Sequence, residues 1–152
     1  MSLEQIHAAI PHRGPMLLVD EIVLQEEQRI VCRKTFRPDE YFFQGHYPDY
    51  PLVPGVILCE ATMQAGAILL SRFIQGEAGV PVATRMNEVK FKRMVRPGET
   101  IEMEVKLTER VGDAFFLVGK TTCDGKVAVR FEFACALARV APETAGNAAV
   151  TG

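Results

Sequence analysis

Three side chains that can accept, donate or orient a proton lie close together in the middle of the chain, at His46, Glu60 and Gln64. Histidine titrates near neutral pH, which suits His46 to the role of general base. Glu60 falls in the apolar run Val56–Ala61, so we expect burial to keep its carboxyl group protonated and able to donate. Gln64 follows Glu60 by one helical turn and is placed to orient it by a hydrogen bond.

His46 and Glu60 also have simpler interpretations. His46 could be an ordinary loop histidine that hydrogen-bonds a neighbour, and Glu60 a core acid with a buried partner or one that faces solvent at a helix edge. The loop favours a function for His46, because Gly45 precedes it and prolines restrict the backbone around it. These prolines are Pro38, Pro48, Pro51 and Pro54.

A helix is expected to begin at Gly55 or Val56, directly after Pro54, and to run to Gly76 as a C′ residue. The first N–H groups of a helix lack intrahelical partners and carry the positive end of its dipole. A carbonyl oxygen that gains negative charge can be stabilised there. A base, an acid and an oxyanion donor together indicate the elimination of water from a 3-hydroxyacyl compound, or the reverse hydration.

The remaining pattern predicts strands around this helix. The helix is apolar nearly all round, which is typical of a buried helix. We therefore expect an α+β fold in which a curved antiparallel sheet of about six strands wraps one long buried helix. The expected elements are a short helix at 3–9, strands at 16–24 and 30–36, and a four-stranded antiparallel meander at 87–95, 100–110, 114–123 and 126–140.

Length and composition indicate one ordinary globular domain. The chain has 152 residues and a net charge of −2, with 48% hydrophobic and 24% charged residues. We expect residues 1–141 to form the domain and 142–152 a disordered tail. No basic run indicates nucleic-acid binding, and polar residues interrupt the longest apolar stretch, which argues against a membrane span.

The four cysteines, Cys32, Cys59, Cys123 and Cys135, show no metal-binding or redox spacing. We expect buried free thiols and no metal site. The first residues lack the layout of a signal peptide, so the protein is expected to be soluble and cytoplasmic.

The segment GHYPDYPLVPGVILCEATMQA resembles the signature GHFPxxPxxPGVLxxEAMAQ of the bacterial beta-hydroxyacyl-[acyl-carrier-protein] dehydratases, including the fourteen-residue step from His46 to Glu60. PHRGPMLLVD (11–20) and VKFKRMVRPGE (89–99) are similar to that family's PHRxPxLLVD and VKFRRPVxPGD. The resemblance covers roughly residues 9–139. This sequence departs from the family at Cys59, at Thr62-Met63 and at Met94, and none of these positions is a candidate site residue.

The resemblance implies the hotdog fold and a dehydratase of (3R)-hydroxyacyl thioesters in fatty-acid or related lipid biosynthesis. It implies His46 as the base at C2 and Glu60 as the acid toward the C3 hydroxyl, with Gly55, Val56 and Gln64 in the oxyanion and substrate-binding set. Glutamate at position 60 favours the simple dehydratase over the relative that also isomerises the double bond. No cofactor is implied, since the acyl chain arrives on the phosphopantetheine arm of acyl carrier protein.

The resemblance also implies an assembly, because in that family the histidine and the acid of one site come from different subunits. A homodimer would be the minimum unit, possibly assembled as a trimer of dimers. The acidic carrier protein would meet a cluster of cations. In a simpler interpretation, these cations are solvated charges of a strand face and a turn. These cations are Lys90, Lys92, Arg93 and Arg96.

Two alternatives stay open at this point. A hotdog acyl thioesterase uses a carboxylate and water on the same scaffold and would not require His46. A non-catalytic acyl-binding subunit would not need the full acid–base set. Chain-length preference and the choice between housekeeping synthesis and a specialised lipid A, polyketide or pigment pathway are not encoded in these motifs.

Overall fold

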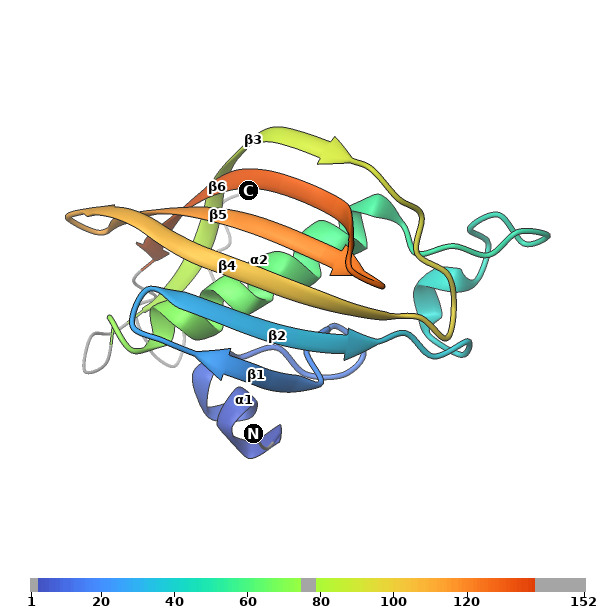
Figure 1. The fold of residues 1–152 in the computed structure, drawn as a ribbon. Coiled ribbons are helices and arrows are strands. Elements are labelled where there is room, and N and C mark those ends of the chain that lie inside the picture. Colours follow the sequence, from blue (N-terminus) through green and yellow to red (C-terminus); the bar gives the residue numbers. More distant parts are fainter. Residues whose placement is uncertain (1–2, 75–78, 139–152) are drawn as a thin grey trace, which may run out of the picture.

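A computed structural model describes residues 3–74 and 79–138 of the chain. Six strands form one antiparallel sheet in the order β1-β2-β4-β5-β6-β3, which wraps around helix α2 (Figure 1). The expected α+β hotdog arrangement is confirmed. The elements are α1 (Leu3–Ala9), β1 (Glu21–Gln25), β2 (Arg29–Thr35), the 3-10 turn η1 (Tyr41–Phe43), α2 (Gly55–Ser71), β3 (Val80–Phe91), β4 (Thr100–Val111), β5 (Ala114–Cys123) and β6 (Lys126–Ala138).

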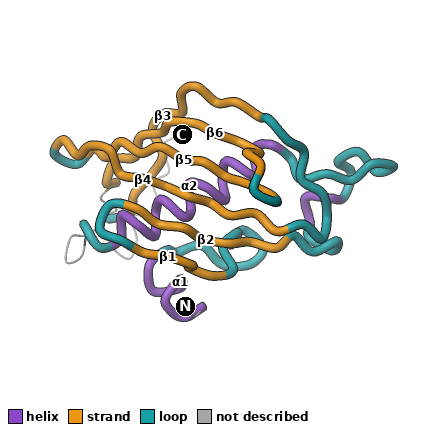
Figure 2. The backbone as a smooth tube through the Cα atoms, in the orientation of Figure 1, coloured by secondary structure: helices purple, strands orange, loops and turns teal. Residues whose placement is uncertain are grey.

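The expected four-stranded meander is only partly correct. Strands β4, β5 and β6 pair in sequence, whereas β3 pairs with β6 at the far edge of the sheet. The connection from β3 to β4 therefore passes the end of the sheet, as the tube in Figure 2 shows. The Val53 N–H donates to the Val95 carbonyl across 2.7 Å, so this connection is tied to the segment that leads into α2.

Two strand boundaries were predicted wrongly. The first strand begins at Glu21 rather than at position 16, because the Leu18 N–H donates to Gln64 Oε1 at 2.8 Å instead of to a strand. Strand β3 starts at Val80 and includes Pro81, although prolines usually interrupt strands. Proline is tolerated here because β3 lies at the sheet edge, where an N–H is not needed on the open side.

Helix α2 is shorter and less enclosed than its sequence suggested. It ends at Ser71, and the expected C′ residue Gly76 lies outside the described residues, as does the predicted tail at 142–152. The prediction of burial all round is wrong, since Val56 is 73% exposed and Glu60 is only half-buried. One stripe of the helix thus faces away from the sheet. Within the described part of the chain, no helix is long and apolar enough to span a membrane.

The buried side of α2 packs against β5 and β6 through small residues. A Cβ atom at Gly66 would lie 2.8 Å from the Phe133 ring, and one at Gly119 would lie 2.5 Å from Thr62 Cγ2. Thr62 is fully buried, and its hydroxyl bonds the Leu58 carbonyl at 2.8 Å and Thr121 Oγ1 at 2.5 Å. Glycine at 119 therefore sets how closely the helix approaches the sheet.

We expect Gly119→Ala to destabilise the protein by about 1–3 kcal/mol, because the new methyl group overpacks a buried contact that cannot move freely. Thr62→Ser removes the Cγ2 atom that the methyl would meet and keeps the hydroxyl. The cost of Gly119→Ala should therefore be smaller in the Thr62→Ser background. Urea unfolding of the four proteins measures the coupling, and equal costs in both backgrounds would contradict this packing account.

Candidate active site

His46 is held in the loop between η1 and α2 by a backbone that uses unusual conformations on both sides of it. Gly45 and Tyr47 have φ angles of +77° and +49°. The Nδ1 atom of His46 lies 3.1 Å from the Leu52 carbonyl oxygen. Because a carbonyl only accepts, Nδ1 must carry the hydrogen, and the lone pair is on Nε2. The predicted rigid loop thus presents a defined tautomer that can accept a proton.

A cavity of about 790 Å³ opens beside His46, with a mainly apolar wall. Its apolar lining suits an acyl chain rather than a polar ligand. The first turn of α2 and the end of β3 meet at this cavity. It is lined by His46, Tyr47, Leu52, Val53, Gly55, Val56, Leu58, Phe91, Lys92, Arg93 and Met94.

The N-terminus of α2 reaches this cavity with free donors. Pro54 occupies the N-cap and no side chain caps the helix; its carbonyl accepts from the N–H groups of Ile57 and Leu58 at 2.9 and 3.3 Å. Among the described residues, the N–H groups of Gly55 and Val56 have no hydrogen-bond partner. A Cβ atom at Gly55 would lie 2.7 Å from Phe91 Cε1, so glycine allows the close approach of that ring.

Glu60 and Gln64 form the second part of the candidate site. The Gln64 Nε2 donates to Glu60 Oε2 at 3.2 Å and to the Met16 carbonyl at 2.7 Å, while its Oε1 accepts from Leu18. The predicted orienting contact is therefore present. Because Oε2 of Glu60 accepts an N–H, a proton on this carboxyl group belongs on Oε1.

The two parts line different cavities within one chain. Glu60 and Gln64 line a smaller cavity of about 210 Å³, which shares no lining residue with the cavity of His46, Gly55 and Val56. The acid is half-buried rather than enclosed in the core, contrary to its expected burial. The smaller cavity is lined by His12, Glu60, Met63, Gln64, Ala67, Pro81, Val82, Ala83 and Cys135.

The four predicted cations do not all line one cavity, although Arg93 and Arg96 line a cavity together. Lys92 and Arg93 line the His46 cavity, whereas Lys90 lines a charged groove with Glu104, Lys120 and Arg130. The Arg96 guanidinium lies 4.4 Å from the centre of the Tyr50 ring. Only Lys92 and Arg93 therefore stand beside the cavity of His46.

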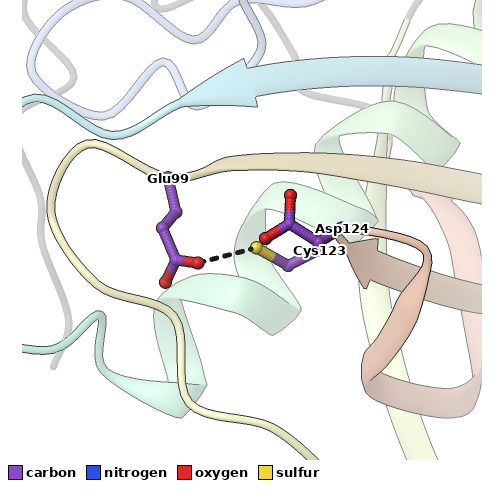
Figure 3. Close-up of side chains that lie close together, drawn as sticks. All are labelled: Glu99, Cys123 and Asp124. Carbon is purple, nitrogen blue, oxygen red and sulfur yellow. Dashed lines mark hydrogen bonds between the residues drawn. The ribbon is translucent and has the colours of Figure 1, made fainter.

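Glu99, Cys123 and Asp124 form the one cluster of potential metal ligands among the described residues (Figure 3). Arg93 already occupies it, with Nη2 at 2.9 Å from Glu99 and 3.5 Å from Asp124, and with Nη1 donating to the Cys123 carbonyl. A guanidinium in this position competes with any cation. We interpret the cluster as an ion-pair network that fixes Arg93 beside the His46 cavity.

All four cysteines are free and buried, as predicted. Burial raises the pKa of Cys59 to about 11 and that of Cys32 to about 12, so these thiols stay protonated at neutral pH. Cys59 precedes Glu60 but points into the core. It is therefore not a candidate nucleophile.

Two residues near the candidate site were not singled out from the sequence. Phe91 is 55% exposed and covers Gly55. His12 lines the cavity of Glu60, and its Nδ1 is buried without a hydrogen-bond partner among the described residues. The PHRGP segment that contains His12 was the available signal, but its sequence gives no hint that it packs against α2.

The sequence matches a known protein family over most of its length. Residues 10–132 match the model of the FabA-like domain. The chain is 39% identical over 137 residues to the "3-hydroxyacyl-[acyl-carrier-protein] dehydratase FabZ" of Clostridium perfringens, with 90% of this chain and 99% of the relative covered. It is 40% identical over 134 residues to the protein of the same name from Staphylococcus carnosus, with 88% and 92% covered.

Solved structures share the fold at low identity. The dehydratase heterocomplex ApeI:P from Xenorhabdus doucetiae has a TM-score of 0.76 at 16% identity, covering 88% of this chain and 91% of that chain. The PaaI protein of the E. coli phenylacetic acid degradation operon has a TM-score of 0.62 at 17% identity, covering 76% and 81%. At this identity the likeness concerns the fold alone. On the match of its sequence over most of its length, the chain belongs to the FabA-like family.

Proposed function

We propose that this chain is a 3-hydroxyacyl-[acyl-carrier-protein] dehydratase, which removes water from (3R)-hydroxyacyl thioesters to form trans-2-enoyl thioesters in fatty-acid or related lipid biosynthesis. The names of its relatives support the reaction. The observation that supports this mechanism best is that His46, Gly55 and Val56 line one cavity. His46 is the candidate base, and the N–H groups of Gly55 and Val56 have no hydrogen-bond partner among the described residues. Elimination next to a carbonyl requires both.

In the proposed reaction, Nε2 of His46 removes a proton from C2 of the substrate. The Leu52 carbonyl holds the ring in the tautomer that makes Nε2 the acceptor. Negative charge then develops on the thioester oxygen, where the N–H groups of Gly55 and Val56 stabilise it together with the helix dipole. These donors are fixed before the reaction, so stabilising the charge requires little reorganisation.

Glu60 supplies the second proton in this proposal. Its Oε1 protonates the C3 hydroxyl, which leaves as water, while Gln64 holds Oε2. A proton taken at C2 and another given at C3 leave the thioester without net change in charge. The chemistry needs neither a redox cofactor nor a metal, and their absence from the reaction stays a prediction.

A second copy of the chain would bring the two parts together. Strand β3 is paired with β6 on one side only, and its side chains Val82, Met86 and Phe91 are 41%, 38% and 55% exposed. A long unpaired edge with apolar side chains is a template for another strand. Antiparallel pairing of β3 with its copy would also cover the open stripe of α2. We propose a homodimer in which His46 of one chain faces Glu60 of the other; assembly beyond the dimer stays a prediction.

The carrier protein is proposed to dock at the mouth of the His46 cavity. Lys92 and Arg93 line this cavity, and the substrate's phosphopantetheine arm carries a negative phosphate. Arg93 is already engaged by Glu99, which leaves Lys92 as the cation most available to an anionic partner. Lys90 and Arg96 have a weaker case on this geometry. The expected cytoplasmic location stays a prediction.

The first test is the reaction itself. Purified protein should interconvert 3-hydroxyacyl and trans-2-enoyl thioesters, followed by enoyl absorbance on carrier protein and on coenzyme A at several chain lengths. His46→Ala and Glu60→Gln should each lower kcat by about 10²–10⁴-fold, because each removes one proton-transfer step. Circular dichroism should show that both variants keep the fold.

Thioesterase activity is the outcome that would contradict this proposal. It would appear as release of free thiol from the same substrates, with His46→Ala retaining the wild-type rate. Thiol release and enoyl absorbance are measured in parallel on one sample, so the two reactions are separated directly.

The shared site predicts complementation between inactive variants. In a heterodimer of His46→Ala and Glu60→Gln, one of the two sites receives both intact residues. Random exchange of an equal mixture should therefore restore about a quarter of the wild-type activity. Subunit exchange is verified by mass spectrometry of tagged chains. If exchange is complete and no activity returns, His46 and Glu60 act within a single chain.

The oxyanion role of Gly55 can be separated from its small size. Proline at the first position of a helix removes the N–H and is tolerated there, whereas alanine adds a Cβ and keeps the N–H. Gly55→Pro should lower kcat by about 10²–10³-fold relative to Gly55→Ala, because one oxyanion donor is lost. Steady-state kinetics of the two variants test this, and equal rates would argue against an oxyanion role for the Gly55 N–H.

A further inference from the structure

The loop that carries His46 is joined to the sheet by a buried ion pair that the proposed reaction does not use. Lys34 lies on β2, and Glu40 lies between β2 and η1. Lys34 Nζ is 2.8 Å from Glu40 Oε1, and the two side chains are only 6% and 7% exposed. A second acid, Asp20, lies farther from Lys34 Nζ, at 3.7 Å, with its side chain half exposed. Neither member of the buried pair lines the cavity of His46 or that of Glu60, so neither is placed to contact the substrate there.

A buried ion pair is a poor means of adding stability. Removing two charges from water is costly, and apolar side chains of similar size often stabilise a fold as well or better. What the pair adds is direction, because a hydrogen-bonded pair requires both groups in one geometry, whereas apolar contacts are non-directional. Phe36 and Phe42 already pack the start of this loop on the core, with their ring centres 5.7 Å apart. The ion pair therefore calls for a role besides holding the loop against the sheet.

Hydrogen bonds lead from Glu40 to the backbone of His46. Both carboxylate oxygens of Glu40 are fixed, because Oε1 pairs with Lys34 and Oε2 accepts from the Arg37 N–H at 2.9 Å. The Glu40 carbonyl accepts from the Phe43 N–H at 3.1 Å, and the Phe43 carbonyl accepts from the His46 N–H at 3.4 Å. Two backbone hydrogen bonds thus connect the residue of the ion pair to the candidate base.

The partner of the His46 ring is fixed independently, at the other end of the loop. The ring Nδ1 donates to the Leu52 carbonyl at 3.1 Å. That carbonyl belongs to the same planar peptide unit as the Val53 N–H, which donates to the Val95 carbonyl at 2.7 Å. The hydrogen bond that sets the tautomer of His46 therefore joins a segment held by β2 to a segment held by the connection between β3 and β4.

We propose that Lys34 and Glu40 are a positioning pair, which holds the backbone of His46 where its ring meets the Leu52 carbonyl. With this hydrogen bond present, the hydrogen stays on Nδ1 and the lone pair on Nε2 is free to accept a proton. Without the pair, His46 and Leu52 can move relative to each other. The hydrogen can then reside on Nε2, which no longer acts as a base. This inference rests on the proposed function, in which His46 is the base, and deepens it.

Removing both charges at once tests the pair without leaving one charge buried alone. Lys34→Met/Glu40→Gln keeps the side chains similar in size, and the new amide oxygen can still accept from the Arg37 N–H. We expect kcat to fall by about 10–100-fold, because a small displacement of a catalytic group is costly. KM should stay nearly unchanged, since the pair lies outside both cavities. Urea unfolding shows whether the variant is fully folded under the assay conditions.

An exposed ion pair in the same turn provides the matched control. Arg37 Nε lies 3.2 Å from Asp39 Oδ1, and these side chains are 71% and 79% exposed. Exposed pairs contribute little to structure, so Asp39→Asn should keep the wild-type kcat. A wild-type kcat in folded Lys34→Met/Glu40→Gln would overturn the proposal. An equal loss of kcat in Asp39→Asn would also overturn it, because the effect would not belong to the buried pair.

The tautomer of His46 gives a readout that needs no activity. Nitrogen NMR shifts of the ring distinguish a hydrogen on Nδ1 from one on Nε2. The chain has three histidines, His7, His12 and His46, so His46→Ala identifies the signals of His46. At a pH where the ring is neutral, the wild type should show the Nδ1–H form, and Lys34→Met/Glu40→Gln a mixture of both forms. A pair that only stabilises the fold would leave the tautomer of the folded protein unchanged, and that result would overturn the proposal.

If the double variant does not fold, Glu40→Asp carries the same test. This variant keeps both charges but shortens the acid by one methylene, so a smaller fall in kcat and a partial change of tautomer are expected. Wild-type values of both would overturn the proposal. If the wild-type protein does not dehydrate the substrates, the proposed function fails, and the tautomer still decides whether Lys34 and Glu40 hold His46 in place.

Discussion

The buried amide of Gln64 is the interaction on which the site depends. Its side chain is only 1% exposed, and its oxygen and nitrogen hold three groups at once, namely the Leu18 N–H, the Met16 carbonyl and the Glu60 carboxyl group. The backbone groups can each play only one role, donor or acceptor, so they fix which way the amide points. The same residue therefore orients the acid and anchors the N-terminal segment against α2.

The proposed catalytic residues of α2 lie on the stripe of the helix that is least buried. Val56, Glu60 and Met63 follow the spacing of one helix face, and all three are exposed or half-buried. The His46 loop lies at the N-terminal end of this stripe, beside Val56. In the proposed homodimer, catalysis and assembly would therefore use one surface, because the second copy that covers the stripe would also complete the site.

The sequence predicted the strands best where one pattern of burial continues along the whole segment. Strand β5 alternates strictly between buried and half-buried residues, and β4 alternates over its first eight residues. The bounds of β4 and β5 were predicted closely for that reason. Strand β3 is exposed along most of its length, so its residues from Val80 show no alternation to detect. The start of β1 depends on Gln64, which lies 46 residues away from Leu18, and no local pattern encodes that contact. His12 escaped notice for the same reason, since its neighbours at the cavity come from α2, β3 and β6.

The start of α2 lacks a stabilising feature that most helices have, and the proposed mechanism gives a reason for this. A serine, threonine or aspartate at an N-cap satisfies an exposed N–H and stabilises a helix by about 0.5–2 kcal/mol. Pro54 offers no such side chain, and the N–H groups of Gly55 and Val56 are unpaired among the described residues. A capping side chain at this point would occupy the donors that a developing oxyanion needs. In the proposed mechanism, the uncapped turn keeps its dipole and its donors for the substrate, and the packing of the rest of α2 against the sheet offsets the missing cap.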